Sequence, residues 1–179
     1  MSIRQNIEFW HDQFPALLVA GLTPDQLAWQ PDKHDTSVQF AIWHAFRAGD
    51  DLLHGLVFKQ PSVFASQGWA DRLRAETTGM TPFGNGMTRE QIGALRFDID
   101  ALLAYGRAVG ESVCGHVEHM SDEDSAAAVS LPFFAQAYPT MAQMSKAECI
   151  AFFAIGHICE HLGEVQMVKG LMGMRGAPL

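Results

Sequence analysis

The sequence has few cysteines and no long apolar run. Its three cysteines, Cys114, Cys149 and Cys159, occur at no spacing typical of a zinc knuckle, which disfavours a disulfide framework and favours a reducing compartment. Polar residues interrupt every apolar run well before the roughly 20 residues that cross a bilayer. No apolar N-terminal run is followed by a cleavage site. We therefore expect a cytoplasmic protein with no signal peptide and no membrane partner.

Basic residues are scarce as well. The chain carries 12 Lys and Arg against 20 Asp and Glu, which gives a formal net charge of -8 at pH 7. A protein with this charge repels the phosphate backbone of nucleic acids and the surface of anionic membranes. We therefore expect no nucleic-acid partner.

What the sequence does contain is typical of one globular domain. Hydrophobic residues make up 48% and charged residues 18% of the 179 residues, enough to bury a core without disulfides. The length also fits a single domain over residues 1–179. No segment has the sustained two-residue alternation expected of a β-strand.

Four long segments instead place apolar residues at the three- and four-residue spacings of an amphipathic helix. They cover approximately residues 2–20, 37–58, 88–120 and 145–170. Thr36 or Ser37 can cap the second helix. Thr88 and Ser145 open the third and fourth, each followed three residues later by Gln or Glu in a capping box. The pattern predicts an all-α fold, a four-helix bundle.

The connection between the second and third helices, residues 59–87, is long and irregular. Its end, GMTPFGNGM, lacks the lysine and hydroxyl that complete a P-loop. These glycines indicate a turn with Asn85 and Gly86 at its corner. A separate single turn of helix is expected between Thr23 and Pro31.

Two histidines in GHICEHLGE stand four residues apart in the last helix. At 100° per residue, His157 and His161 lie about 40° apart, where two imidazoles can reach one ion. Ile150 and Phe153 fall on the same face by this count, so the face should be buried, and Glu160 lies at its shoulder. Burying unpaired imidazoles is unfavourable. Either a metal ion or a hydrogen-bonded core network could satisfy them.

The second helix offers a third imidazole, His44. Asp51 lies on the same face, two turns further on, and Arg47 lies at its shoulder. Three histidines from two facing helices with one open position are a common catalytic metal arrangement. A histidine satisfied within the core is the rival interpretation of His44. The other five histidines are expected at the surface or at helix ends; they are His11, His34, His54, His116 and His119.

The letters HICEH also match a protease pattern in which the glutamate between the two histidines is the general base. Such a site needs a third protein ligand, and only 18 residues follow His161 in which to find one downstream. Short motifs of this kind also match by chance. We therefore place the protease interpretation below the alternatives.

Several segments resemble the DinB-like, or YfiT-like, superfamily of small bacterial metalloproteins. They are LTPDQLAWQP, SVQFAIWHAFRAGDDLL, VFASQGWADRL with NGMT, and GHICEHLGEVQMVKGL, and they cover most of the chain. The resemblance implies a four-helix bundle, often a homodimer. It also implies a divalent ion held by His44, His157 and His161, the residues that the helical faces select.

Relatives of this kind include thiol-dependent transferases and proteins described as metal-dependent hydrolases. The first hypothesis is therefore a metal-dependent enzyme that acts on a small molecule, with zinc or nickel on the imidazoles and a low-molecular-weight thiol as one candidate substrate. Asp51 and Glu160 are candidate catalytic or orienting groups, and Arg47 could bind a substrate carboxylate. The second hypothesis is a non-enzymatic, stress-associated protein with a structural ion, to which Asp51, Glu160 or Glu164 would add the fourth ligand.

Overall fold

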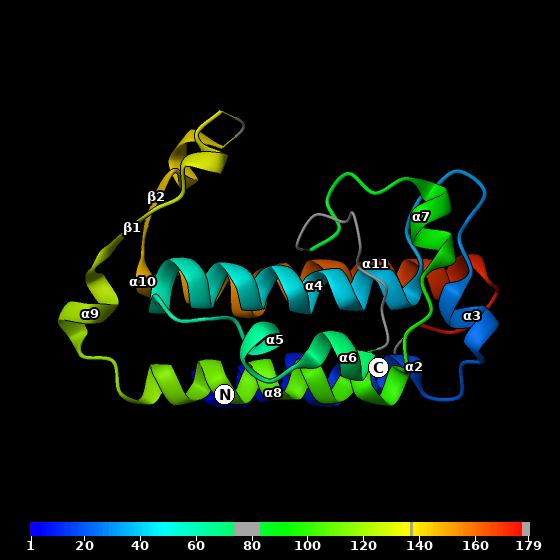
Figure 1. Ribbon diagram of the computed structural model, residues 1–179, viewed down its shortest axis with the longest axis horizontal. Coiled ribbons are helices and arrows are strands. Elements are labelled where there is room, and N and C mark those ends of the chain that lie inside the picture. The colour runs from blue at the N-terminus through cyan, green and yellow to red at the C-terminus, as the bar shows by residue number, and fades with distance from the viewer. Residues whose placement is uncertain (74–82, 137, 177–179) are drawn as a thin grey trace.

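The computed structural model describes residues 1–73, 83–136 and 138–176. Four long helices lie in two layers, with α4 beside the C-terminal helix in one layer and α8 beside the N-terminal helix in the other (Figure 1). The N-terminal helix comprises α1 (Ile3–Glu8), η1 (Phe9–Gln13) and α2 (Phe14–Val19). The second runs through α4 (Val38–Leu52) and η2 (Leu53–Phe58), the third is α8 (Ile99–Glu118), and the last comprises α10 (Lys146–Ala151), η5 (Phe152–Gly156) and α11 (His157–Leu171).

Short elements connect the long helices. They are α3 (Pro24–Ala28), α5 (Val63–Ser66), α6 (Trp69–Leu73), α7 (Arg89–Ala94), α9 (Asp122–Ala126), β1 (Ala128–Ser130), η3 (Pro132–Phe134), η4 (Pro139–Met141) and β2 (Gln143–Ser145). The all-α bundle is thus as predicted, and α3 is the expected single turn. In the long connection, α5 and α6 are the described helical turns, and residues 74–82 lie outside the described residues. Asn85 and Gly86 form the predicted corner, where Gly86 has a φ of 79°. No helix of the described residues combines the length and apolar content needed to span a membrane.

The predicted helix starts are confirmed in detail. The Ser37 hydroxyl accepts a hydrogen bond from the backbone N–H of Phe40, so it is Ser37 and not Thr36 that caps α4. Both predicted capping boxes are present, one opening α7 and one opening α10. Each satisfies backbone N–H groups that the first turn of a helix leaves without a partner.

The predicted third helix, however, is two helices. α7 ends at Ala94, and α8 begins at Ile99 with Asp98 as its cap. Buried Gln39 stabilises the non-helical backbone at this break, because its side-chain N–H donates to the Leu95 carbonyl and its oxygen accepts from the Phe97 N–H. These two bonds replace those that a continuous helix would make, and the sequence of 88–120 alone does not reveal them.

The expectation that the chain has no strands is wrong at one place. β1 pairs antiparallel with β2, with Val129 opposite Met144. Three residues per strand are too few for the alternation that a sequence pattern detects. The paired strands and the two short helical turns between them, residues 128–136 and 138–145, form an arm that projects from one end of the bundle (Figure 1).

Three of the four long helices contain a wide π-type turn, namely η1, η2 and η5. A turn of this kind accommodates an extra residue and shifts the register of the side chains that precede it. The count of 100° per residue from His157 back to Ile150 and Phe153 therefore does not hold across η5. Both residues are nevertheless buried, whereas His157 and His161 both lie within α11 and keep their predicted spacing.

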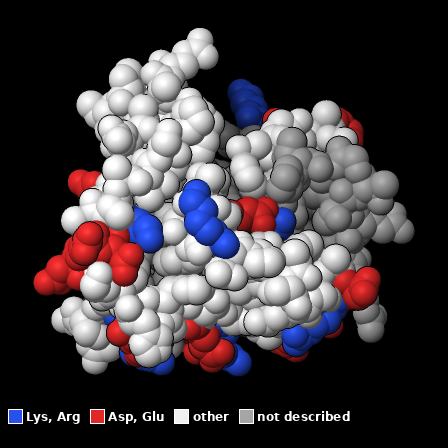
Figure 2. All heavy atoms as spheres, turned by 60° about the vertical axis from the view of Figure 1, so that its left-hand side comes forward, with Lys and Arg blue, Asp and Glu red and all other residues white. Residues whose placement is uncertain are grey.

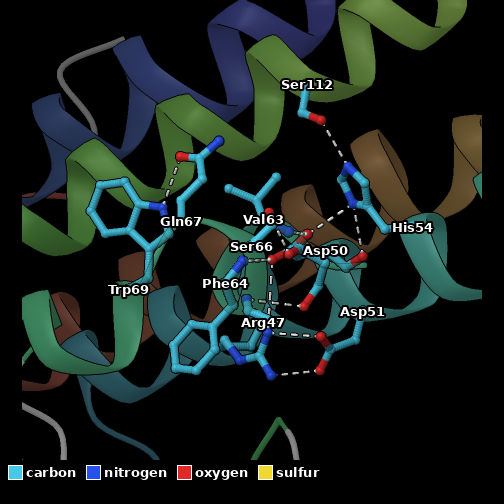
Figure 3. A network of polar contacts seen from close by, with 12 residues as sticks. Arg47, Asp50, Asp51, His54, Val63, Phe64, Ser66, Gln67, Trp69 and Ser112 are labelled. Atoms are coloured by element: carbon cyan, nitrogen blue, oxygen red, sulfur yellow. Dashed lines mark hydrogen bonds and ion pairs between the residues drawn. The ribbon is translucent and has the colours of Figure 1, made fainter. Parts of the chain in front are cut away.

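A buried carboxylate joins the two layers of the bundle. Asp50 on α4 accepts hydrogen bonds from the backbone N–H groups of Val63 and Phe64, each at 2.8 Å, and from the Tyr105 hydroxyl at 2.7 Å. The ring of His54 lies between Asp50 and the Ser112 hydroxyl of α8, 2.8 Å from each (Figure 3). Burial alone would raise the pKa of Asp50, but the hydrogen bonds to its carboxylate outweigh burial and lower it.

His54 therefore corrects a sequence prediction, as does His11. Both were expected at the surface or at helix ends, and both are buried. The Nε2 atom of His11 lies 2.9 Å from the Ala154 carbonyl oxygen, a contact between the first and last helices that no local pattern predicts. His34 and His119 are exposed as expected, and His116 is partly buried against the Phe58 ring.

We expect Asp50→Asn to lower the free energy of unfolding by about 3 kcal/mol or more, because the amide keeps the volume but cannot accept from all four donors. Asp71→Asn, an exposed acid-to-amide change on α6, is the matched control and should stay within about 0.5 kcal/mol. Urea unfolding followed by circular dichroism measures both. Equal stability of the two variants would contradict the role given to Asp50.

Candidate metal centre

Close packing of two helices brings the three predicted histidines together. His44 projects from α4, and His157 and His161 project from α11, one turn apart. The two helices lie side by side along their length. Gly49 permits this approach, because a Cβ at this position would lie 3.2 Å from the Phe153 carbonyl oxygen of the last helix. A larger residue there would push α4, and His44 with it, away from α11.

The imidazoles meet at a distance suited to one ion. One ring nitrogen from each of the three lies within 4.8 Å of the others. The Nε2 atoms of His157 and His161 are 3.1 Å apart. A tetrahedral ion with bonds of about 2.0–2.1 Å needs ligand nitrogens roughly 3.3 Å apart. The separation of His157 and His161 is already close to this spacing.

Hydrogen bonds at the outer nitrogens orient two of the three rings. Nδ1 of His44 lies 2.6 Å from the Phe83 carbonyl oxygen, and Nδ1 of His161 lies 2.8 Å from a Glu164 carboxylate oxygen. Carbonyl and carboxylate oxygens only accept, so each Nδ1 carries the proton and each neutral ring has a bare Nε2. Metal-ligating histidines typically have this kind of outer partner.

His157 supplies the test of whether a cation fits. Its buried Nδ1 has no hydrogen-bond partner among the described residues, and its Nε2 faces the bare Nε2 of His161. With the proton on Nδ1, a buried donor lacks an acceptor and two lone pairs oppose each other. With the proton on Nε2, Nδ1 is left as a buried acceptor without a donor. A cation between the rings removes the opposition of lone pairs, so the donor set fits a divalent ion.

The protonation state also favours metal binding. Burial, reinforced by the neighbouring His161 and His44 rings, lowers the pKa of His157 to about 3. Burial likewise lowers the pKa of His44. Both rings are therefore neutral at pH 7, the form that donates a lone pair to a metal.

The three histidines border an open cavity of about 720 Å³. Its lining comes from α4, from the connection before α7, from the arm and from the last helix, and the residues are His44, Ala48, Leu52, Phe83, Asn85, Phe133, Phe134, Tyr138, Met141, Phe152, Phe153, His157, Glu160 and His161. Phe152 and Phe153 of η5 form part of this wall. A volume of this size is typical of small-molecule sites.

Among the candidate polar groups, Glu160 is the one that reaches this cavity, where it is exposed. Arg47 and Asp51 instead contact each other, with Arg47 nitrogens 2.8 and 2.6 Å from the two carboxylate oxygens (Figure 3). The guanidinium also lies over the Phe64 ring. Neither residue is among those that line the cavity. Their proposed roles as substrate-binding and catalytic groups stay predictions, as does that of Glu160.

Sequence reasoning missed the groups that orient the rings. Glu164 was considered as a direct ligand, whereas here its carboxylate contacts Nδ1 of His161. The three-residue spacing of His161 and Glu164 could have suggested this. The Phe83 carbonyl and the arm had no such signal, because long connections bring them to the site.

Comparison with known proteins bears out the resemblance. A family model described as the DinB superfamily matches residues 11–165. The chain belongs to the DinB superfamily. A solved structure described as the conserved protein of locus from Enterococcus faecalis is similar to this DinB-superfamily chain, with a TM-score of 0.69 and 16% identity over 94% of this chain and 95% of that one. At this identity, the likeness bears on the fold alone. A search of curated proteins finds no match.

The lowered pKa of His157 predicts that metal-free protein loses stability in acid. An unfolded histidine takes up a proton near pH 6.5, whereas folded His157 does so only at about pH 3. Between these values the unfolded state binds more protons, so the free energy of unfolding falls as the pH falls.

His157 should contribute a slope of up to about 1.4 kcal/mol per pH unit within that window. Urea unfolding in the presence of a chelator, from about pH 7.5 to pH 5, measures the slope. His157→Gln should make it shallower. If wild type and variant had parallel slopes, the ring would not be held neutral by the fold.

Proposed function

We propose that this DinB-superfamily protein is a divalent-metal-dependent enzyme that acts on a small molecule, by hydrolysis or by transfer of a thiol. The observation that carries the proposal is that three imidazoles converge at the wall of an open cavity rather than in a sealed core. Three protein ligands leave a coordination position for an exogenous group, which is typical of catalytic centres.

Imidazole ligands suit zinc and nickel. When bound, such an ion supplies Lewis-acid activation of a small nucleophile at neutral pH. The protein's own residues do the rest. Phe83 and Glu164 hold two rings with Nε2 toward the centre, and Glu160 is placed at the cavity to exchange a proton with a ligand there. We also propose that the protein assembles as a homodimer. This part of the proposal rests on the family resemblance and not on a contact among the described residues.

A structural ion is the competing function, and it requires a fourth protein ligand. The two other carboxylates considered for this role already have partners, because Glu164 contacts His161 and Asp51 contacts Arg47. Glu160 is left as the candidate, since it lines the same cavity as the histidines. The two functions therefore differ in whether Glu160 or an exogenous molecule takes the fourth position.

Protein purified without a histidine tag should contain close to one equivalent of zinc or nickel by elemental analysis. His44→Ala, His157→Ala and His161→Ala should each lower metal affinity at least about 100-fold, and Glu164→Gln about 10- to 100-fold. Titration against a competing chelator measures this, with exposed His34→Ala as the control. Unchanged affinity in the three histidine variants would overturn the site.

Cobalt-substituted protein distinguishes the catalytic from the structural centre. If the fourth position is open, azide or a simple alkyl thiol should change the visible absorption spectrum, because it enters the coordination sphere. Glu160→Gln should leave the starting spectrum unchanged. If added ligands left the spectrum unchanged and Glu160→Gln altered it, the ion would be structural, with Glu160 as its fourth ligand.

A further inference from the structure

The arm that walls the cavity carries no charge. Residues 126–145 contain no Asp, Glu, Lys or Arg, although 18% of the whole chain is charged. In Figure 2 the arm is the white projection at upper left, and the surface is hollowed between it and the body of the molecule. Phe133 and Tyr138 on the arm are 51% and 59% exposed. Large exposed aromatic side chains beside a cavity are typical of a binding surface.

Aromatic contacts connect the arm to the floor of the cavity. The Phe134 ring stacks on Phe153 of the last helix, with ring centres 6.2 Å apart and planes 9° apart. It also meets the edges of Phe152 and Tyr138. Phe152 and Phe153 belong to η5, and His157 follows η5 directly as the first residue of α11. An aromatic wall therefore runs from the arm to the imidazoles.

The charges at the cavity disfavour an anion. Among the described residues that line it, Glu160 is the one with a formal charge, and neither Lys nor Arg is present. On the other side of His44 and His161, a smaller cavity of about 290 Å³ is bordered by Asp35 and Glu164. Carboxylates beside a cavity repel a ligand that carries carboxylate, sulfonate or phosphate groups.

We propose that the cavity binds an uncharged small molecule with an aromatic or branched apolar body, held between the arm and the last helix. The inference rests on the proposed function in one respect, the orientation of the bound molecule, whose polar end faces the histidines. A divalent ion on the histidines would attract one anionic group, so the charge preference concerns the rest of the molecule. Within the hydrolase and thiol-transfer alternatives, it selects substrates with an apolar, uncharged body and disfavours peptide thiols that carry several carboxylates. The volume of about 720 Å³ accommodates a molecule of drug-like size.

Two fluorescent probes that differ by one sulfonate test the charge preference. N-phenyl-1-naphthylamine is uncharged, and 1-anilinonaphthalene-8-sulfonate is the same molecule with an anionic group. Metal-free full-length protein should bind the uncharged probe about tenfold or more tightly than the anionic one, because of repulsion by Glu160. Glu160→Gln should reduce this ratio mainly by improving binding of the sulfonate.

Variants of the arm locate the binding. Phe133→Ser and Tyr138→Ser should each weaken binding of the uncharged probe about fivefold, through lost aromatic contact. Both side chains are more than half exposed, so folding should persist, which thermal unfolding checks. Leu17→Ser on α2, 46% exposed and away from the cavity lining, is the matched control and should bind like wild type. The inference would be overturned if the protein bound the two probes with equal affinity. It would also be overturned if neither arm variant weakened binding of the uncharged probe.

Metal titration of the same samples separates this inference from the proposed function. If the uncharged probe binds at the arm but no metal binds, the proposed enzyme fails and the apolar site stands. If metal binds with the expected affinity while neither probe binds, the apolar site fails alone.

Discussion

The contact between α4 and α11 is the constraint on which the candidate site depends. His44 lies more than 100 residues before His157 in the chain, and only the packing of the two helices brings their rings to 5.5 Å between centres. The small side chain of Gly49 lets α4 approach the backbone of the last helix at Phe153. The contact partly buries the rings, and burial lowers the pKa of His44 and of His157, which leaves the lone pairs of these two rings for a cation.

Contacts on the opposite face of α4 hold this helix in place. Asp50, one helical turn and a half beyond His44, ties α4 to α5 and to Tyr105 of α8. Gly106 of α8 lies against the Phe46 ring, where a Cβ would come within 2.3 Å of a ring carbon. The face of α4 that turns away from the histidines is therefore fixed in the bundle, in part by the hydrogen bonds of Asp50 in Figure 3.

The site combines two unlike environments. On one side, hydrogen bonds from outer nitrogens to Phe83 and Glu164 set the orientation of two imidazoles. On the other side, the uncharged arm and the wide turn η5 present aromatic rings. Wide turns of this kind often occur at functional sites, and here η5 places Phe152 and Phe153 beside the histidines that follow it. A polar cluster of histidines thus borders an apolar space.

The sequence alone was enough for the features that depend on local patterns. These are the all-α bundle, the capping residues Ser37, Thr88 and Ser145, and the pairing of His157 with His161 on one face, because each depends on residues within one or two helical turns. The helical face of the second helix offered His44 as a third ligand, and the motifs that resemble the DinB superfamily selected the same residue.

Tertiary structure alone decided the rest. The burial of His11 and His54, the break stabilised by Gln39 and the aromatic arm all depend on partners outside the local pattern or on a change in helix register. Hydrophobic periodicity describes which face of a helix is buried, but not which side chain from another element meets it there. Polar partners of that kind are chosen by packing, and packing exists only in the folded chain.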